Sequence, residues 1–243
     1  MPLKRILLDK EGNKFYISDI NSDVHTKFGY IKKKDLKKTK GTVKTNTGNE
    51  FFIFTAQCPD KFKKLKRGAQ IITLKDAGTI ITETGIGKSS KIVDAGGGSG
   101  ALACILANIV KEITTYETRK DFVKIINHNI KNFELTNIKV KNKDITKGIT
   151  EKNLDVITLD LPDPEKVLEH AAKSLKPGAF LVAYVPSVTQ IISFVKKIRK
   201  SESFVIVKIL ENIQREWKVE GKIARPEFRM LGHTGFLIFT RKI

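Results

Sequence analysis

Four acidic residues follow short apolar segments of the chain: Asp94, Glu117, Asp144 and Asp160. Apolar runs of this length, bounded by turn residues, are typical of buried strands in a parallel sheet. Because ligands of such sheets bind beyond the carboxyl ends of the strands, we expect the four acids to line one crevice. Carboxylates in a crevice can bind an ammonium group, the hydroxyls of a ribose and the exocyclic amine of a purine.

A glycine-rich turn follows the first of these segments. Residues 92–100 read Ile-Val-Asp-Ala-Gly-Gly-Gly-Ser-Gly, and residues 101–110 carry apolar side chains at helical spacing. Glycine permits a positive φ and the close approach of a ligand, and the start of a helix offers free backbone N–H groups. The turn therefore favours a ligand site, although a tight turn that binds nothing would use the same residues.

The positions of the other acids narrow the class of ligand. Glu117 comes 23 residues after Asp94, where an acid can accept both hydroxyls of a ribose; a solvated Glu at the start of a helix is the alternative. The later glycine that would receive a pyrophosphate is not evident. S-adenosylmethionine, a nucleoside with an ammonium group and no pyrophosphate, satisfies this pattern. The predicted cofactor-binding residues are Asp94, Gly96, Gly98, Ser99, Gly100, Ala101, Glu117, Asp144 and Asp160.

The last of the four acids stands in a stiff loop, Asp160-Leu-Pro-Asp-Pro164. Proline fixes φ and donates no hydrogen bond, so this loop holds one shape. A carboxylate held there can stabilise positive charge that develops on an adenine, or accept a proton from its exocyclic amine. We therefore predict Asp160 to be catalytic, the alternative being a side chain that only shapes the pocket. Gln190, His233 and Tyr184 are the candidates to grip the base.

The elements around these residues indicate an α/β fold. Seven predicted strands alternate with helices, and the last two, residues 204–207 and 235–239, follow one another with only a polar, aromatic-bearing insert over residues 214–234 between them. This order is typical of a doubly wound, Rossmann-like seven-stranded sheet closed by an antiparallel pair. Short strands separated by Gly and Asn turns before residue 60 predict a small β domain. We expect a basic N-terminal β domain over residues 1–65 and a catalytic domain over residues 66–243.

Charge points to a polyanionic partner. The chain has 45 basic and 26 acidic residues, a formal charge of +19, and residues 1–70 hold 17 basic and 7 acidic side chains. Nucleic-acid phosphates are the natural partner of such a surface, although 37 lysines against 8 arginines also fit a merely well-solvated surface. Two cysteines without metal-ligand spacing predict no metal site or disulfide framework. No apolar run is long enough to span a membrane, so we expect a cytoplasmic protein.

Taken together, the motifs resemble one enzyme family, the tRNA (adenine-N1)-methyltransferases of TrmI type, and the tail resembles the archaeal members. The resemblance covers nearly the whole chain and rests on Asp94-Ala-Gly-Gly-Gly-Ser-Gly100, Glu117, Asp160-Leu-Pro-Asp-Pro164, Pro186 with Gln190, Arg215-Glu216-Trp217, Arg225-Pro226, His233-Thr234-Gly235-Phe236, His25-Thr26 with Gly29, and Gly68-Ala-Gln70 to Lys75-Asp76-Ala77. The glycine motif is common among methyltransferases, whereas the Asp-Leu-Pro loop and the His-Thr-Gly-Phe tail are more particular.

The resemblance implies a fold, an activity and an assembly. Such enzymes have the fold of class I S-adenosylmethionine-dependent methyltransferases, methylate N1 of an adenosine in the T-loop of tRNA at position 58, and form homotetramers. Archaeal members also modify the neighbouring position 57. By resemblance, Asp160, Gln190 and His233 are the expected catalytic residues. Two departures, Asp94 where many members have Glu and Gly97 where they have Thr, should be tolerated. The segment Ile72-Thr73-Leu74 lacks the aromatic residue or His that some members carry.

Three other functions share part of this pattern. A nicotinamide-dependent oxidoreductase would use the glycine turn and Glu117, but it would need the later glycine and a proton donor. A protein isoaspartate methyltransferase has a similar fold, but it would not explain the basic N-terminal segment. A noncatalytic RNA-binding subunit with a vestigial cofactor pocket would not need acids at all four strand ends. We therefore expect an S-adenosylmethionine-dependent enzyme that acts on tRNA.

Overall fold

The computed structural model describes all 243 residues. The chain forms two compact units. One comprises Met1–Lys66 together with His128–Thr136, and the other comprises Arg67–Asn127 together with Asn137–Ile243. None of the helices is long and apolar enough to cross a lipid bilayer.

The larger unit is built on a seven-stranded sheet, as the alternation in the sequence predicts. Its strands lie in the order β12 (Phe204–Glu211), β15 (Phe236–Lys242), β11 (Leu175–Val185), β10 (Leu154–Leu159), β7 (Lys91–Ala95), β8 (Glu112–Tyr116) and β9 (Ile138–Lys141). The five strands from β11 to β9 run parallel, and β15 pairs antiparallel with both β11 and β12. The order reverses between β7 and β10, which is where ligands bind in sheets of this kind.

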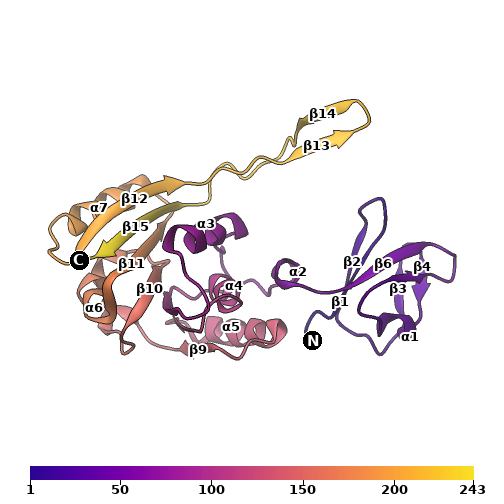
Figure 1. Cartoon of the computed structure of the whole chain (residues 1–243), viewed down its shortest axis with the longest axis horizontal. Coiled ribbons are helices and arrows are strands. Elements are labelled where there is room, and N and C mark those ends of the chain that lie inside the picture. Colours follow the sequence, from indigo (N-terminus) through magenta and orange to yellow (C-terminus); the bar gives the residue numbers. More distant parts are fainter. The chain divides into compact units, whose positions relative to one another are not determined.

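Helices cover both faces of this sheet (Figure 1). The helices α3 (Leu74–Thr84), α4 (Ala101–Ala107) and α5 (Lys120–Phe133) lie on one side, and α6 (Leu168–Ser174) and α7 (Val188–Ile198) lie on the other. The core beneath α6 and α7 includes Ile157, Leu181 and Phe194, which are fully buried. Since parallel strands are covered on both faces, their sequences are nearly continuous apolar runs. For this reason the ends of these strands could be predicted from the sequence.

The smaller unit is β-rich. A four-stranded antiparallel sheet has the order β2 (Lys14–Ile17), β1 (Arg5–Leu8), β6 (Glu50–Thr55) and β5 (Thr42–Lys44), and β3 (Val24–Thr26) pairs with β4 (Gly29–Ile31). Two short helices, α1 (Lys33–Leu36) and α2 (Cys58–Lys63), complete it.

Residues 128–136 were not expected in this unit, because they lie far along the chain and end a helix of the other one. Glu134 forms ion pairs with Lys4 and Lys61, and Asn129 exchanges hydrogen bonds with the backbone of Lys66. The small unit is therefore completed by a segment from the middle of the chain.

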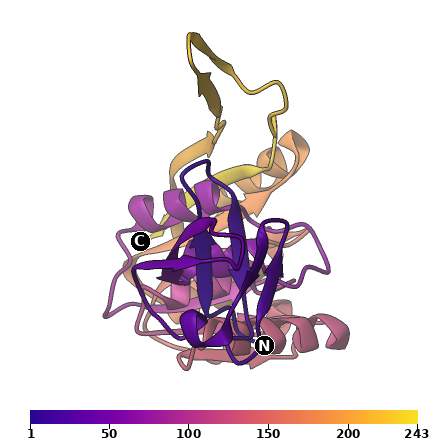
Figure 2. The ribbon, with the colours of Figure 1, turned by 90° about the vertical axis from the view of Figure 1, so that its right-hand side faces the viewer.

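The polar insert before the last strand forms a projecting hairpin. Strands β13 (Trp217–Glu220) and β14 (Ile223–Pro226) pair with each other alone, and Figure 2 shows this part of the chain, in gold, extending away from the sheet. We call residues 213–233 the arm. Trp217, the only tryptophan, is 61% exposed, so it is not a core residue. Phe236, by contrast, packs against the core.

Several element boundaries differ from the sequence prediction, and the last two strands, expected over residues 204–207 and 235–239, extend to Glu211 and Lys242. The helix expected over residues 101–110 ends at Ala107, and the segment Lys176-Pro177-Gly178, whose residue types are typical of a turn, lies inside β11. The register between β10 and β11 shifts after Leu154 pairs with Leu175, so the intervening residues of β11 form an irregular stretch with Gly178 at a positive φ. A bulge of this kind accommodates turn residues within a strand.

The close approach of Gly96 to the backbone of Asp160 can be tested by substitution. Gly96 has a φ of +82°, and a Cβ atom there would lie 1.9 Å from the carbonyl oxygen of Asp160. We expect Gly96→Ala to lower the free energy of unfolding by about 2 kcal/mol or more, measured by chemical denaturation, because both strain and a backbone clash are introduced.

Gly78 provides the matched control. It lies within α3, and a Cβ atom there would meet nothing within 4 Å. Gly78→Ala should raise the free energy of unfolding by up to about 1 kcal/mol, since alanine is the better helix former. Equal effects of the two substitutions would contradict the close approach of Gly96 to Asp160.

Candidate functional site

A cavity of about 480 Å³ lies at the carboxyl ends of the central strands, within the larger unit. All four strand-end acids line it, as the sequence predicts. The other lining residues come from the segment before α3, the glycine turn, the loops after β8, β9 and β10, and the ends of β11 and the arm; they are Ala69, Gln70, Ile71, Ile72, Gly96, Gly97, Gly98, Ser99, Ala101, Leu102, Tyr116, Thr118, Arg119, Lys143, Ile145, Leu161, Pro162, Tyr184, Pro186 and Thr234.

Asp94 is the most deeply buried of the acids. It is 2% exposed, and its two carboxylate oxygens accept hydrogen bonds from Thr115 on β8 and Thr158 on β10, at 2.9 and 2.8 Å. Burial raises the pKa of this carboxyl, and the charge of Glu117 adds to the effect, while the two hydroxyls oppose it. The neighbouring strands thus fix the side chain between them.

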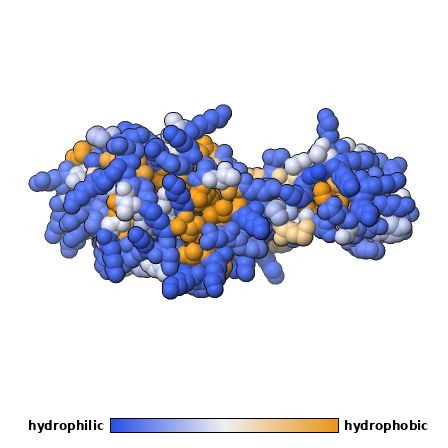
Figure 3. Space-filling model, turned by 90° about the horizontal axis from the view of Figure 1, so that it is seen from below, coloured by the Kyte–Doolittle hydropathy of each residue, from blue (hydrophilic) through white to orange (hydrophobic).

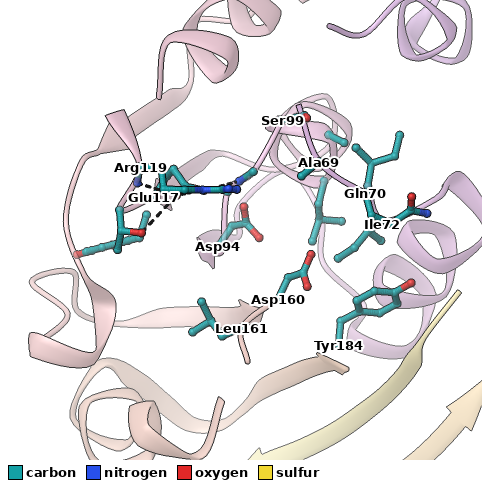
Figure 4. A pocket seen from close by; sticks show the side chains of 18 of the residues that line it. Ala69, Gln70, Ile72, Asp94, Ser99, Glu117, Arg119, Asp160, Leu161 and Tyr184 are labelled. Atoms are coloured by element: carbon teal, nitrogen blue, oxygen red, sulfur yellow. Dashed lines mark hydrogen bonds and ion pairs between the residues drawn. The ribbon is translucent and has the colours of Figure 1, made fainter. Parts of the chain in front are cut away.

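Asp160 follows β10 and shares this buried space. Its carboxylate and that of Asp94 both point into the cavity (Figure 4). Burial, together with the charge of Asp94, raises the pKa of Asp160 to about 7. The protein itself supplies the Asp160 carboxylate with no hydrogen-bond donor. The cavity therefore presents two adjacent carboxyl groups whose ionisation would be favoured by a cation between or beside them.

Glu117 and Asp144 are held by backbone groups. The carboxylate of Glu117 accepts hydrogen bonds from the N–H groups of Gly98 (2.8 Å) and Arg119 (2.9 Å). Each carboxylate oxygen keeps a second lone pair, so Glu117 can still accept hydroxyl groups. Asp144 caps the short 3₁₀ helix η1 (Ile145–Lys147), and hydrogen bonds from Thr146 lower its pKa. Glu117 is nearly buried rather than solvated.

The glycine turn contributes as expected, with one exception. Gly96, Gly98 and Gly100 all have positive φ, and Gly96, Gly98, Ser99 and Ala101 line the cavity. Gly100 does not line it. Instead it is the residue before α4, where its N–H donates to the carbonyl of Gly97 at 2.6 Å and shapes the turn.

Gln190 and His233 lie behind the cavity wall. Gln190 donates to the carbonyl of Pro162 at 3.0 Å, and His233 Nε2 lies 2.9 Å from the carbonyl of Pro186; both prolines line the cavity, whereas Gln190 and His233 do not. His233 Nδ1 lies 2.6 Å from the carboxylate of Glu211. The hydrogen bonds to Glu211 and to the Pro186 carbonyl both raise the pKa of His233. A protonated imidazole donates to both partners, so it suits this position.

A buried polar cluster joins the start of α3 to both ends of the arm. Asp76, which is fully buried, accepts hydrogen bonds from Thr73, Thr234 and Asn212 at 3.0, 2.9 and 3.2 Å. Lys75 Nζ donates to Asp76, to Thr234 and to the carbonyl of Asn212 at 2.7 to 2.8 Å. Asn212 precedes the arm and Thr234 follows it, so this cluster fixes the base of the arm beside the cavity wall.

Several of these residues were not singled out by the sequence analysis. Thr115 and Thr158 are polar residues within otherwise apolar strands. Because a buried hydroxyl requires a hydrogen-bond partner, their positions in the sequence could have indicated a nearby buried acceptor. Arg119 and Lys143 line the cavity as well. The segment before α3 entered the sequence analysis only as part of the family resemblance. In the structure Gln70 and Ile72 line the cavity, and Asp76 lies in the first turn of α3.

The raised pKa of Asp160 has a consequence for stability. In the unfolded chain this carboxyl titrates near its ordinary value of 3.8, and in the folded protein it titrates near 7, so the folded state binds more protons between these values. Stability should therefore fall as the pH rises from about 4 to about 7. Asp160→Asn, which cannot ionise, should be more stable than the wild type at pH 8 by a few kcal/mol, with little difference at pH 4. Parallel stability curves for the two proteins, measured by urea unfolding, would contradict the buried charge.

The polar cluster at the base of the arm can be tested in the same way. Asp76→Asn removes the charge that compensates Lys75, so we expect the free energy of unfolding to fall by about 3 kcal/mol. Fluorescence anisotropy of Trp217 should also fall, because the arm is less firmly held. The control is Glu83→Gln, which removes an ion pair with Lys208 on the exposed side of the same helix and should cost less than about 1 kcal/mol. Unchanged anisotropy in Asp76→Asn would show that the cluster does not hold the arm.

Comparison with known proteins relates this geometry to one family. The sequence model of the family described as "tRNA methyltransferase complex GCD14 subunit" matches residues 52–225. A protein of Methanocaldococcus jannaschii named tRNA (adenine(57)-N(1)/adenine(58)-N(1))-methyltransferase TrmI is 32% identical over 98% of this chain and 94% of its own length.

Two solved structures share the whole fold. A SAM-dependent O-methyltransferase from Thermotoga maritima superimposes with a TM-score of 0.87 at 27% identity, covering 99% of this chain and 92% of its own. The tRNA (m1A58) methyltransferase TrmI from Aquifex aeolicus gives a TM-score of 0.83 at 26% identity, covering 99% and 96%. With matches of this extent in sequence and in fold, the chain belongs to the TrmI-type tRNA (adenine-N1)-methyltransferase family.

Proposed function

We propose that this protein transfers a methyl group from S-adenosylmethionine to N1 of an adenosine in the T-loop of tRNA. The observation that carries the proposal is the convergence of Asp94, Glu117, Asp144 and Asp160 on one cavity beside the glycine turn. The names of the relatives support the same reaction. Position 58 is the expected target, with position 57 as the second site that the name of the M. jannaschii relative suggests.

The residues present fit S-adenosylmethionine. Asp94 and Asp160 are adjacent buried carboxyls with raised pKa values, so a ligand with positive charge relieves their repulsion. Glu117 keeps lone pairs free for the ribose hydroxyls, and Asp144 can accept the amine of the adenine. Gly96 lets the glycine turn pass directly against the backbone of Asp160, because a Cβ atom there would lie 1.9 Å from the Asp160 carbonyl oxygen. We assign the cofactor to Asp94, Gly96, Gly98, Ser99, Ala101, Glu117, Asp144 and Asp160, with Gly100 shaping the turn.

The cofactor supplies a methyl group already activated by a sulfonium charge. The protein therefore has mainly to hold the target nitrogen in line and to exclude water. As N1 is alkylated, positive charge develops on the adenine. Asp160 stabilises that charge from the rigid loop before Pro162 and Pro164, or accepts the proton of the exocyclic amine. The cationic cofactor lowers the pKa of Asp160 from its ligand-free value of about 7, which favours the ionised carboxylate that either task requires.

Gln190 and His233 act as positioning residues in this proposal. Each hydrogen-bonds the backbone of a proline in the cavity wall, so each fixes the surface against which the base lies. Tyr184 is the side chain that reaches the cavity itself, beside Asp160 and Ile72 (Figure 4). Its pKa is raised to about 12 by burial, so it stays a neutral phenol that can offer both a ring face and a hydroxyl. A stacked adenosine must be drawn out of the tRNA before it can enter.

We also propose that the protein works as a homotetramer in the cytoplasm. The resemblance to TrmI-type enzymes implies the tetramer, and the arm supports it, because exposed apolar side chains gather there. These are Ile213, Trp217, Val219, Ile223, Phe228 and Leu231, each more than half exposed. Burial of these side chains against another subunit would remove apolar surface from water and so stabilise the assembly. Sedimentation at micromolar concentration, compared with a variant that lacks residues 214–232, tests this assembly.

The activity is tested by supplying the purified protein with labelled S-adenosylmethionine and a tRNA transcript. N1-methyladenosine blocks base pairing, so reverse transcription should stop at position 58 and, if both sites are used, at 57. Asp160→Ala should lower turnover at least 100-fold, more than it weakens S-adenosylmethionine binding, because it removes the charge that stabilises the adenine while Glu117 and Asp144 keep the nucleoside contacts. Incorporation into protein instead of tRNA, or undiminished turnover of Asp160→Ala, would overturn the proposal. No heat on titration with S-adenosylmethionine would indicate a noncatalytic subunit.

A further inference from the structure

A group of charged and polar side chains lies inside the larger unit, at the edge of the methyl-transfer cavity. Hydrophilic residues cover most of the surface seen in Figure 3, whereas Asp76 is fully buried and the side chain of Lys75 is only 13% exposed. Charges are costly to bury unless they are paired and hydrogen-bonded. The group reaches the cavity through Thr234, which lines it.

The two charged members of this group have all their hydrogen-bonding positions filled. One carboxylate oxygen of Asp76 accepts from Lys75 and Asn212, and the other accepts from Thr73 and Thr234. A carboxylate has about four lone-pair sites, so Asp76 is saturated. Lys75 has three N–H donors, and it donates to Asp76, to Thr234 and to the carbonyl of Asn212. Neither charge has a position left for another partner.

The hydroxyl of Thr234 has one position left. It donates its proton to Asp76 at 2.9 Å, and it accepts a hydrogen bond from Lys75 at 2.7 Å. A hydroxyl has one proton and two lone pairs, so Thr234 can accept one more hydrogen bond and has no proton left to donate. A further partner of this hydroxyl must therefore be a donor.

Tyr184 is placed to be that donor. It stands at the end of β11, which pairs with the beginning of β15, next in the chain to Thr234 and Gly235. A Cβ atom at Gly235 would lie 2.5 Å from Cζ of Tyr184 and 2.8 Å from its hydroxyl oxygen, so the glycine lets the phenol lie against the backbone. Burial raises the pKa of Tyr184 to about 12, and its environment includes a hydrogen bond with Thr234. Because the proton of Thr234 is committed to Asp76, the phenol is the donor in this bond.

A phenol that donates its proton to Thr234 presents only lone pairs to the cavity. It can then accept a hydrogen bond from a ligand but cannot donate one. The exocyclic amine of adenine is a donor, whereas guanine carries a carbonyl acceptor at the same position. The amine has two N–H groups, and Tyr184 and Asp160 lie beside each other in the cavity (Figure 4), so each can receive one of them.

We propose that Thr234, held by Lys75 and Asp76, is a positioning residue that fixes the phenol of Tyr184 as an acceptor for the exocyclic amine of the target adenosine. The proposal rests on the proposed function for the identity of the substrate. It gives the buried group a part in the selection of adenine, in addition to holding the base of the arm.

The test compares two tRNAs with the full-length protein. One carries adenosine at the target position, and the other carries purine riboside, which lacks the exocyclic amine. The measured quantity is the ratio of kcat/KM for the two tRNAs. Tyr184→Phe should lower this ratio about fivefold, because the amine loses one acceptor. The different intrinsic reactivity of the two bases is the same for every variant, so it cancels when the ratios are compared.

Substitutions of Thr234 separate positioning from mere packing. Thr234→Val keeps the shape but removes the hydroxyl, and it should lower the ratio about as much as Tyr184→Phe does. Thr234→Ser keeps the hydroxyl and should retain the wild-type ratio. Calorimetric titration with S-adenosylmethionine checks that each variant is folded with its cofactor site intact.

The double variant Tyr184→Phe/Thr234→Val should have the same ratio as Tyr184→Phe alone, because Thr234 acts on the amine only through the phenol. Two outcomes would overturn the proposal. In the first, Thr234→Val slows the reaction with both tRNAs equally and leaves the ratio unchanged, as a purely structural role requires. In the second, the effects of the two substitutions on the ratio add.

The outcome can be separated from that of the proposed function. If the wild-type protein methylates the adenosine tRNA while Tyr184→Phe and Thr234→Val keep the wild-type ratio, the reaction stands and the role of Thr234 fails. If the wild-type protein methylates neither tRNA, the assigned reaction fails, and the role of Thr234 fails with it.

Discussion

The burial of two carboxyl groups next to each other is the constraint on which this site depends. Removing a carboxylate from water is costly, and a second one beside it adds repulsion. The protein lowers the cost for Asp94 with two threonine hydroxyls, but it leaves Asp160 without a donor and with a pKa of about 7. A strongly basic protein has many lysines with which it could neutralise this pair. The pair is instead left for a ligand to complete.

The backbone keeps the carboxyl groups of Asp94 and Asp160 next to each other. Asp160 cannot move away, because its N–H donates to the carbonyl of Ala95 at 2.8 Å and prolines follow it at positions 162 and 164. Behind the cavity wall, hydrogen bonds from Gln190 and His233 hold the backbone, and Lys75 and Asp76 hold the base of the arm. The base of the arm and the cavity wall are thus held by neighbouring hydrogen-bond networks.

Much of this architecture could be predicted from the sequence, because it is encoded locally. A buried parallel strand is a short apolar run, and the acid at its end is adjacent in the chain, so Asp94, Glu117, Asp144 and Asp160 could be read as one group. The residues of the glycine turn are likewise adjacent in the chain. The seven-stranded fold then followed from the order of the segments.

What could not be predicted depends on contacts between distant parts of the chain. The residues around Asp76 in the sequence do not indicate a buried cluster, which forms only because residues 212 and 234 meet beside it. Gln190 and His233 have the residue types of a catalytic group, but their hydrogen bonds to proline carbonyls depend on how α7 and the end of the arm approach the loops that follow β10 and β11.

The central claim, that buried carboxyl groups await a cationic ligand, is tested most directly by counting protons on binding. Calorimetric titration with S-adenosylmethionine at pH 6.5, in buffers of different ionisation enthalpy, should show release of a large fraction of one proton, because the cation lowers the pKa of Asp160 from about 7. S-adenosylhomocysteine, which lacks the sulfonium charge, should release less, and Asp160→Asn should abolish the release. Binding of S-adenosylmethionine with no proton release from the wild-type protein would contradict this account.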